Sequence, residues 1–228
     1  MTAAALRIGV LGGTFDPLHH GHLDAADAAR RALALTEVVL MPSGTQPHRT
    51  SPARVSGYHR FAMAALACAE REGLRVSDLE LQASEPSYTS LTLQRLAQAG
   101  YAPSQLFFVL GSDAFSQIAH WHDYPAVLDR SHFAVVARTG TPLAALRSRL
   151  PDLADRMHAA DDQSTGRIQP DSPAVWLVDA ETRNVSSSCI RRRLGAAEST
   201  GDLLPDSVAA HISRHRLYGA AAPGELLA

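Results

Sequence analysis

The stretch from Ile8 to His22 constrains the fold of this chain more than any other, because its character changes twice over a short distance. An apolar, β-branched run that ends at Leu11 gives way to Gly12 and Gly13, and then to a helix-compatible run with three histidines. This order predicts a strand, a tight loop and the start of a helix. Such a loop brings backbone N–H groups and the positive end of the helix dipole to one place, where they stabilise an anion.

His19 and His22 make phosphate the favoured anion. They are three residues apart, so they project from neighbouring positions on one face of the first helical turn. Three other interpretations stay open on spacing alone: a plain strand-to-helix turn, a dinucleotide-binding loop and a zinc site. The stretch lacks the G-x-G-x-x-G fingerprint, and the histidine pair lacks both the Glu of a His-Glu-x-x-His site and a nearby Cys.

Length and composition set the class of protein. A chain of 228 residues, of which 46% are hydrophobic, can bury a full core, and we expect one domain over residues 1–228 with loose termini at 1–6 and 219–228. A net charge of −2 gives no bulk attraction for nucleic acid or for a membrane surface, so neither partner is expected. The sequence shows neither a long apolar span nor a secretory leader, and its two cysteines are far apart, which together predict a cytoplasmic location.

Strand-length apolar runs alternate with helix-like segments. Beyond the opening strand and loop, strands are expected at Glu37–Met41, within Leu74–Leu81, and at Leu106–Leu110, His132–Ala137 and Ala174–Asp179. Helices are expected at Leu23–Leu35, Gly57–Glu72 and Ser90–Ala99, from Pro142 until Pro151 interrupts, and at Leu203–Tyr218 after Pro205. The alternation predicts an α/β fold with a doubly wound, mainly parallel sheet and C-terminal helices. Asp152–Ser172 is polar, acidic and irregular, and the sequence does not indicate its role.

The expected strand order, 3-2-1-4-5, places the ligand crevice between the first strand and the Leu106–Leu110 strand. Asp113 follows the latter strand, so its carboxylate would face the crevice, where it suits ribose hydroxyls; capping of the next helix is its structural alternative. Trp121 lies in a polar aromatic cluster. Stacking on a planar ring and packing against a helix end are equally open for it.

A second helix start with anion-binding character follows the last predicted strand. Ser186, Ser187 and Ser188 precede Arg191 within about one turn, so a serine N-cap places free N–H groups beside a guanidinium. A plain cap with surface arginines is the competing interpretation. Two such sites in one α/β chain favour binding of an extended phosphate group.

Two loops carry further polar residues. His48 and Arg49 lie in the proline-rich loop after the second strand, where added positive charge at the crevice and a solvated loop are equally open interpretations. Ser87 or Thr89 is the expected N-cap of the following helix, and for this Ser-Tyr-Thr group the physics alone favours capping.

Several motifs together resemble a known family. Gly12–Pro17 with His19–His22 resembles the HxGH signature of the nucleotidyltransferase superfamily, and Val185–Arg191 resembles its second, ISSTxIR-like signature. Ser188 stands where the family commonly has Thr, which keeps the hydroxyl. Four further blocks are similar to the bacterial nicotinate-nucleotide adenylyltransferase family: Pro47–Arg49, Pro86–Thr89, Gly111–Asp113 with Trp121, and Leu203–Tyr218. The resemblance runs from about residue 7 to residue 218.

The resemblance implies a Rossmann-like nucleotidyltransferase fold and adenylyl transfer from ATP to nicotinate mononucleotide, which gives nicotinate adenine dinucleotide and pyrophosphate in NAD synthesis. It implies Mg²⁺ bound through the ATP phosphates and no protein metal site. It assigns catalysis to His19, His22 and Arg191. It assigns ATP binding to Gly12, Gly13, Thr14, Phe15, Gly111, Asp113, Ser187, Ser188 and Arg191. It assigns acceptor binding to Asp16, His48, Arg49, Tyr88, Thr89 and Trp121.

Two alternatives remain at this level. One is an adenylyltransferase for another phosphate acceptor, either nicotinamide mononucleotide or phosphopantetheine. The other is a nucleotide-binding regulator that keeps the fold without catalysis, although the presence of His19, His22 and Arg191 argues against it. The acid or amide preference and the oligomeric state do not follow from the sequence.

Overall fold

A computed structural model of the chain describes residues 6–46, 52–138, 142–160, 168 and 172–220. Its strands form one seven-stranded sheet in the order β3-β2-β1-β4-β5-β7-β6, in which every neighbouring pair is parallel. The strands are β1 Ile8–Gly13, β2 Glu37–Pro42, β3 Leu74–Val76, β4 Leu106–Gly111, β5 His132–Val136, β6 Met157–Ala159 and β7 Val175–Val178. The predicted doubly wound sheet and its 3-2-1-4-5 order are confirmed.

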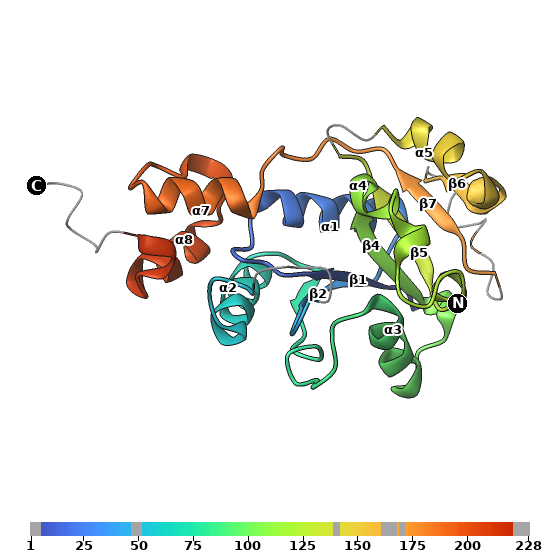
Figure 1. Ribbon diagram of the computed structural model, residues 1–228, viewed down its shortest axis with the longest axis horizontal. Helices are drawn as coiled ribbons and strands as arrows, with labels where there is room; N and C mark the ends of the chain where they lie inside the picture. Colours follow the sequence, from blue (N-terminus) through green and yellow to red (C-terminus); the bar gives the residue numbers. More distant parts are fainter. Residues whose placement is uncertain (1–5, 47–51, 139–141, 161–167, 169–171, 221–228) are drawn as a thin grey trace, which may run out of the picture.

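Helices connect the strands, as a parallel sheet requires. The α-helices are α1 His20–Ala32, α2 Gly57–Ala69, α3 Thr89–Gln98, α4 Ser112–Phe115, α5 Leu143–Arg149, α7 Ser187–Gly195 and α8 Asp206–Arg214. Short 3₁₀ turns are η1 Pro103–Gln105, η2 Ile118–His120, η3 Ala126–Asp129, η4 Pro151–Arg156, η5 Gly201–Leu203 and η6 Leu217–Gly219. Figure 1 shows α7 and α8 together at one end of the molecule, with α5 and β6 at the opposite end. No helix in the described ranges is long and apolar enough to cross a membrane.

The sheet is buried on both faces, and alternate residues of each strand serve two separate cores. On β4, Phe107 belongs to the core that contains Leu23 of α1 and Met63 of α2. Its neighbour Phe108 belongs to the core that contains Leu93 of α3. Burial on both faces explains why the strands appear in the sequence as continuous apolar runs.

Two sequence predictions need correction in the second half of the chain. The stretch predicted to be irregular contains β6, which extends the sheet by pairing in parallel with β7. The C-terminal helix begins after Pro205 as expected, but α8 ends at Arg214, not at Tyr218. It ends there because Arg216 and Tyr218 adopt left-handed backbone angles, with φ of 50° and 59°. The predicted loose termini lie mostly outside the described residues.

Candidate active site

A cavity of about 200 Å³ opens between the carboxyl ends of β1 and β4. It lies where the strand order predicts the ligand crevice, because β1 and β4 are neighbours although β2 and β3 lie between them in sequence. Among its lining residues are Gly12, Gly21, His22, Gly111, Asp113, Arg138 and Thr182. The β1–α1 loop and the end of β4 therefore face one shared space.

The β1–α1 loop is packed so tightly that it requires its glycines. A Cβ on Gly13 would lie 2.8 Å from the ring of Phe15, and one on Gly21 would lie 3.0 Å from the carbonyl oxygen of Arg183. Phe15 is buried at a left-handed φ of 50°, and its ring packs edge-on against that of His22, with centroids 5.0 Å apart. The loop therefore holds the first turn of α1 close to the segment that precedes α7.

His19 and His22 form a stacked pair at the start of α1. Their ring centroids are 3.7 Å apart, and the backbone N–H of His19 donates to Nδ1 of His22 at 3.2 Å. With Nδ1 as acceptor, the proton of the neutral His22 ring resides on Nε2. Burial, followed by the charge of Arg138, lowers the pKa of His19 to about 3. Burial, the neighbouring His19 and Arg138 lower the pKa of His22 well below its usual value, so both rings are neutral at pH 7.

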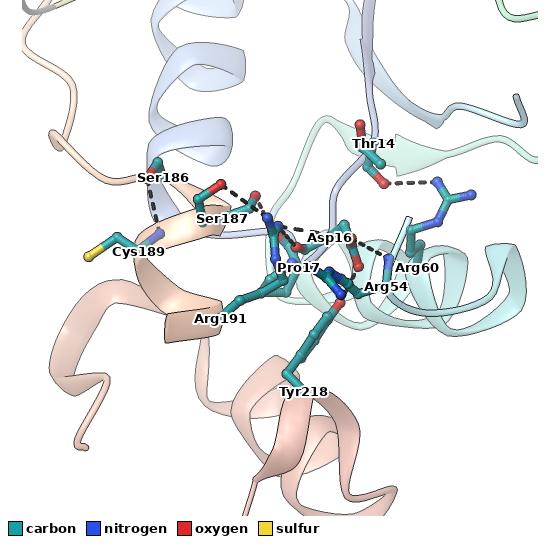
Figure 2. Close-up of polar contacts among 11 residues, drawn as sticks. Thr14, Asp16, Pro17, Arg54, Arg60, Ser186, Ser187, Cys189, Arg191 and Tyr218 are labelled. Carbon is teal, nitrogen blue, oxygen red and sulfur yellow. Dashed lines mark hydrogen bonds and ion pairs between the residues drawn. The ribbon is translucent and has the colours of Figure 1, made fainter. Parts of the chain in front are cut away.

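Helix α7 begins beside this loop, as Figure 2 shows. Ser186 is its N-cap and accepts a hydrogen bond from the backbone N–H of Cys189, so the predicted serine cap is confirmed. The Ser187 hydroxyl donates to the carbonyl of Pro17 at 2.9 Å. Arg191 donates through Nη1 to the carbonyl of Asp16 at 2.6 Å, and through Nη2 to the Ser188 hydroxyl at 3.0 Å. These bonds join the two predicted anion-binding elements.

The Asp16 carboxylate is the centre of the polar contacts in Figure 2. It is 1% exposed, and its Oδ1 accepts from the Tyr218 hydroxyl at 2.8 Å. Its Oδ2 accepts from the backbone N–H of Arg54 at 2.8 Å and lies 3.9 Å from Nη1 of Arg191. Burial and the negative charge of Asp16 raise the pKa of Tyr218, so the phenol stays protonated and donates. Both carboxylate oxygens thus have protein partners, and a role of Asp16 in acceptor binding stays a prediction.

Arg60 of α2 supports the loop from the opposite side. It is 3% exposed and donates through Nη1 to the carbonyls of Thr14, at 2.9 Å, and Ser43, at 2.7 Å. These bonds hold the ends of β1 and β2 together. Arg60 was not predicted from the sequence. Its position four and eight residues before Ala64 and Cys68, on one face of the expected helix, was a usable signal.

Asp113 and Arg138 lie at the mouth of the first cavity. Gly111 is the N-cap of α4, so the capping alternative for Asp113 is wrong. The Asp113 carboxylate lies 4.0 Å from Nη1 of Arg138, whose Nη2 donates to the Val185 carbonyl at 3.3 Å. Arg138 was not predicted. Its place directly after a predicted strand, at the edge that carries Asp113, was the signal that could have identified it.

Aromatic residues gather near the start of α3. The Tyr88 ring stacks on His122, with centroids 4.3 Å apart, and Trp121 contacts Phe108 edge-on at 6.1 Å. Trp121 is half-buried, and this contact accords with the packing interpretation while leaving the stacking of a ligand untested. Of the residues predicted to bind the acceptor substrate, Tyr88 and Trp121 thus lie in this aromatic group.

The expected cap of α3 is wrong. Tyr88 occupies the N-cap position and makes no side-chain capping bond, while Thr89 is the first helical residue. The Ser87 hydroxyl instead accepts from the backbone N–H of Gly44 at 2.9 Å. This bond ties the loop after β2 to the start of α3. His48 and Arg49 lie outside the described residues.

Comparison with known proteins agrees with this geometry. Residues 10–193 match the family described as Cytidylyltransferase-like. A "probable nicotinate-nucleotide adenylyltransferase" of Shewanella baltica (strain OS185) is 34% identical over 93% of this chain and 99% of its own length. One from Roseiflexus sp. (strain RS-1) is 35% identical over 92% of this chain and 97% of its own length.

Among solved structures, the fold is similar to that of Plasmodium falciparum nicotinic acid mononucleotide adenylyltransferase complexed with NaAD. The TM-score is 0.68 at 18% identity, over 95% of this chain and 99% of the other. The sheet order, the joined HxGH-like and serine–arginine elements, and these relatives lead to one assignment. The chain belongs to the nicotinate-nucleotide adenylyltransferase family of cytidylyltransferase-like proteins.

Proposed function

We propose that this protein transfers the adenylyl group of ATP to nicotinate mononucleotide, which yields nicotinate adenine dinucleotide and pyrophosphate, and that it does so in the cytoplasm. The observation that carries the proposal is the direct joining of two anion-binding elements at the crevice. Ser187 and Arg191 of α7 donate to the carbonyls of Pro17 and Asp16 in the histidine-bearing loop. The names of the relatives, and the NaAD bound to the Plasmodium protein, support this choice of substrates.

The substrates are assigned to the parts of the site by chemistry. The adenosine of ATP enters the cavity between β1 and β4, where Gly12 and Gly111 let it approach the backbone and Asp113 accepts from ribose hydroxyls. Gly13 supports this part of the site by making room for the Phe15 ring. The bound triphosphate extends from His22 of α1 to Ser188 and Arg191 of α7. We assign the pyridine ring of the acceptor to Tyr88, Thr89 and Trp121, and we keep His48 and Arg49 as proposed acceptor-binding residues from the sequence alone.

The reaction needs positioning and charge neutralisation more than proton transfer. A phosphate oxygen of the mononucleotide attacks the α-phosphorus of ATP and forms a new P–O bond. The bond between the α-phosphorus and the oxygen that bridges to the β-phosphorus breaks, and pyrophosphate leaves with that electron pair. The attacking oxygen is already ionised at pH 7, so no strong base is required. The neutral imidazoles of His19 and His22 act as fixed dipoles, while the Arg191 guanidinium offsets the charge that develops on the leaving group.

Magnesium enters as part of the ATP substrate. Asp113 is the acidic residue among those that line the first cavity, and its neighbour is the Arg138 guanidinium. Across the described ranges, no three His, Cys, Asp or Glu side chains are grouped to hold a metal ion. This donor set fits an ion that ATP phosphates and water coordinate, because Mg²⁺ commonly keeps its waters and binds through substrate phosphates.

The test is a comparison of acceptors. Purified protein with ATP, Mg²⁺ and nicotinate mononucleotide is expected to release pyrophosphate, and nicotinamide mononucleotide and phosphopantetheine are expected to react more slowly. Faster turnover of phosphopantetheine would identify the protein as an adenylyltransferase for that acceptor instead. ATP binding with no turnover of any of the three acceptors would support the regulatory alternative and refute the proposal.

A further inference from the structure

Glu80 is a buried acidic residue to which the proposed reaction gives no role. It lies in the segment between β3 and α3 and is 4% exposed. Across the described residues, no basic side chain lies within ion-pair distance of its carboxylate. Burial raises the pKa of Glu80, against the opposing effects of hydrogen bonds from Thr92 and Ser87 and of the Arg95 charge. Because a buried carboxylate costs stability, an apolar side chain would suit this place better unless the carboxylate had a specific task.

The hydrogen bonds of Glu80 lead to the start of α3. The Thr92 hydroxyl donates to Oε1 of Glu80 at 2.6 Å and also lies 3.3 Å from the carbonyl oxygen of Tyr88. Thr92 is buried in the first turn of α3, of which Tyr88 is the N-cap. The second hydrogen-bond partner of Glu80 is the side chain of Ser87, directly before Tyr88. The carboxylate thus binds residues on both sides of Tyr88.

The same contacts join α3 to the loop that follows β2. The Ser87 hydroxyl accepts from the backbone N–H of Gly44 at 2.9 Å, so its own proton is free to bond Glu80. The backbone N–H of Ser87 donates to the Thr45 carbonyl at 2.8 Å. A Cβ on Gly44 would lie 2.5 Å from the carbonyl oxygen of Glu80, so the two backbones are in close contact. Glu80 therefore lies where the loop after β2 meets the start of α3.

The start of α3 in turn positions the aromatic group. The Tyr88 ring stacks on His122, and the Ser90 hydroxyl is hydrogen-bonded to Nδ1 of His122 at 2.9 Å. Trp121 is the neighbour of His122 in the sequence. A shift of the first turn of α3 would therefore displace Tyr88, Thr89 and Trp121 together. Helix α3 packs on the face of the sheet opposite α1 and α7, which carry the triphosphate path, as Figure 1 shows for α1.

We infer that Glu80 is a positioning residue for the acceptor substrate, because its carboxylate fixes the start of α3, with Tyr88 and Thr89, against the loop after β2. The inference rests on the proposed function, which assigns Tyr88 and Thr89 to the acceptor. Glu80 acts through these residues and not by contact with the substrate. Loss of its hydrogen bonds should therefore weaken acceptor binding and leave ATP binding unchanged.

Thr92→Val is the sharpest test, because it removes the hydroxyl and keeps nearly the same side-chain volume. In Thr92→Val and in Glu80→Ala, the KM for nicotinate mononucleotide is expected to rise about 10- to 100-fold, the effect of a small misplacement of binding groups. Its dissociation constant, measured by calorimetry, should rise in parallel, while the KM for ATP stays at the wild-type value. Glu80→Gln keeps one acceptor oxygen, so its values should lie between those of Glu80→Ala and the wild type.

Two controls separate positioning from general stability. Thr92→Ser keeps the hydroxyl and should restore the wild-type KM, and the Val and Ser variants decide the question even if Glu80→Ala does not fold. Glu85→Gln is the matched control, because Glu85 is an exposed acid in the same segment that pairs with Arg95 at 2.7 Å. Its KM values should be those of the wild type. A rise of the KM for both substrates together would mean that Glu80 supports only the fold, and would overturn the inference.

Binding and turnover separate this inference from the proposed function. Wild-type affinity for the mononucleotide in both Thr92→Val and Glu80→Ala would overturn the inference even if the enzyme turns over normally. Conversely, a wild-type protein that binds the mononucleotide through this arrangement, and loses the binding in both variants, but adenylates none of the tested acceptors would refute the proposed function alone. A wild-type protein that does not bind the mononucleotide would refute both.

Discussion

The two anion-binding elements of the site are built in opposite ways. On the α1 side, the imidazoles are stacked and neutral, and His19 is only 2% exposed. On the α7 side, the positively charged guanidinium groups of Arg54, Arg191 and Arg192 line an open cavity of about 500 Å³. A few fixed dipoles are effective where water is excluded, whereas open charges act over a longer range but are screened by salt. We therefore expect the α1 side to govern the chemical step and the α7 side to govern phosphate affinity.

The largest expected effect is that of His22→Ala. Removal of its Nε2–H from the crevice should lower kcat by about 10²–10³-fold, the usual loss for one preorganised donor. The free energy of unfolding should fall by less than this change in the barrier, by about 0.5–2 kcal/mol, because the substitution removes the acceptor of the His19 backbone N–H at the start of the helix. Steady-state kinetics and urea unfolding measure the two quantities, with His158→Ala on the edge strand β6 as the control. An unchanged kcat would contradict the assigned role.

Next comes Arg191→Met, which removes two hydrogen bonds and a positive charge. A loss of about 1.5–3 kcal/mol for a charged hydrogen bond predicts a decrease of roughly 10- to 150-fold in kcat/KM for ATP. Arg191→Lys should recover only part of this, because an ammonium lacks the planar fork. The same measurement on Arg193→Met, whose side chain donates to the Ser199 carbonyl, should give the wild-type value. Equal losses in both variants would mean that the effect is not specific to the cavity.

Tyr218→Phe should have a smaller effect, seen mainly in stability. The substitution removes only the hydroxyl that donates to Oδ1 of Asp16, which leaves a buried carboxylate one partner short. We expect the free energy of unfolding to fall by about 1–3 kcal/mol, together with a modest rise in the KM for ATP. Tyr58→Phe serves as the control, since Tyr58 is 88% exposed. Wild-type stability of Tyr218→Phe would show that Asp16 does not depend on the phenol.

Acidification should lower the stability of the protein through its buried neutral histidines, one of which, His19, belongs to the α1 element. Burial lowers the pKa of His19 to about 3 and that of His132, a buried residue of β5, to about 4, both below the value of about 6.5 in an unfolded chain. The unfolded chain then binds more protons, so this stability is complete above pH 6.5 and declines as the pH falls toward these values.

Calorimetry at pH 7.5 and pH 5.0 measures this decline. His132→Asn keeps an acceptor for the Ala174 backbone N–H but removes the titration. It should reduce the loss of stability between the two pH values by at most about 2 kcal/mol. A loss as large as that of the wild type would exclude His132 as a contributor.

Local sequence patterns predicted the framework of the fold well because its strands and loops depend on local chemistry. Strands buried on both faces require continuous apolar runs, such as Leu106–Leu110, and Ser186 caps its own helix. The edge strand β6 could not be predicted in the same way. It has only three residues, one of them His158, and it exists because β7 offers it a pairing edge.

The candidate site was predictable where its residues lie in local motifs and was missed where distant contacts decide. Arg60 reaches Thr14 across 46 positions, and Arg138 reaches Val185 across 47. Ser87 shows the same limit. Its hydroxyl was expected to cap α3, but it accepts from the backbone N–H of Gly44, 43 positions away. No periodicity or short motif encodes such contacts.

The hydrogen bond between Asp16 and Tyr218 joins residues 202 positions apart. During synthesis on a ribosome, the HxGH-like loop is therefore made long before Tyr218, the partner on which the Asp16 carboxylate depends. A nascent chain that already contains His19, His22 and Arg191 therefore still lacks the hydroxyl that donates to the buried Asp16 carboxylate. The loop that carries the two histidines can therefore take up its final hydrogen bonds only after residue 218 has been made.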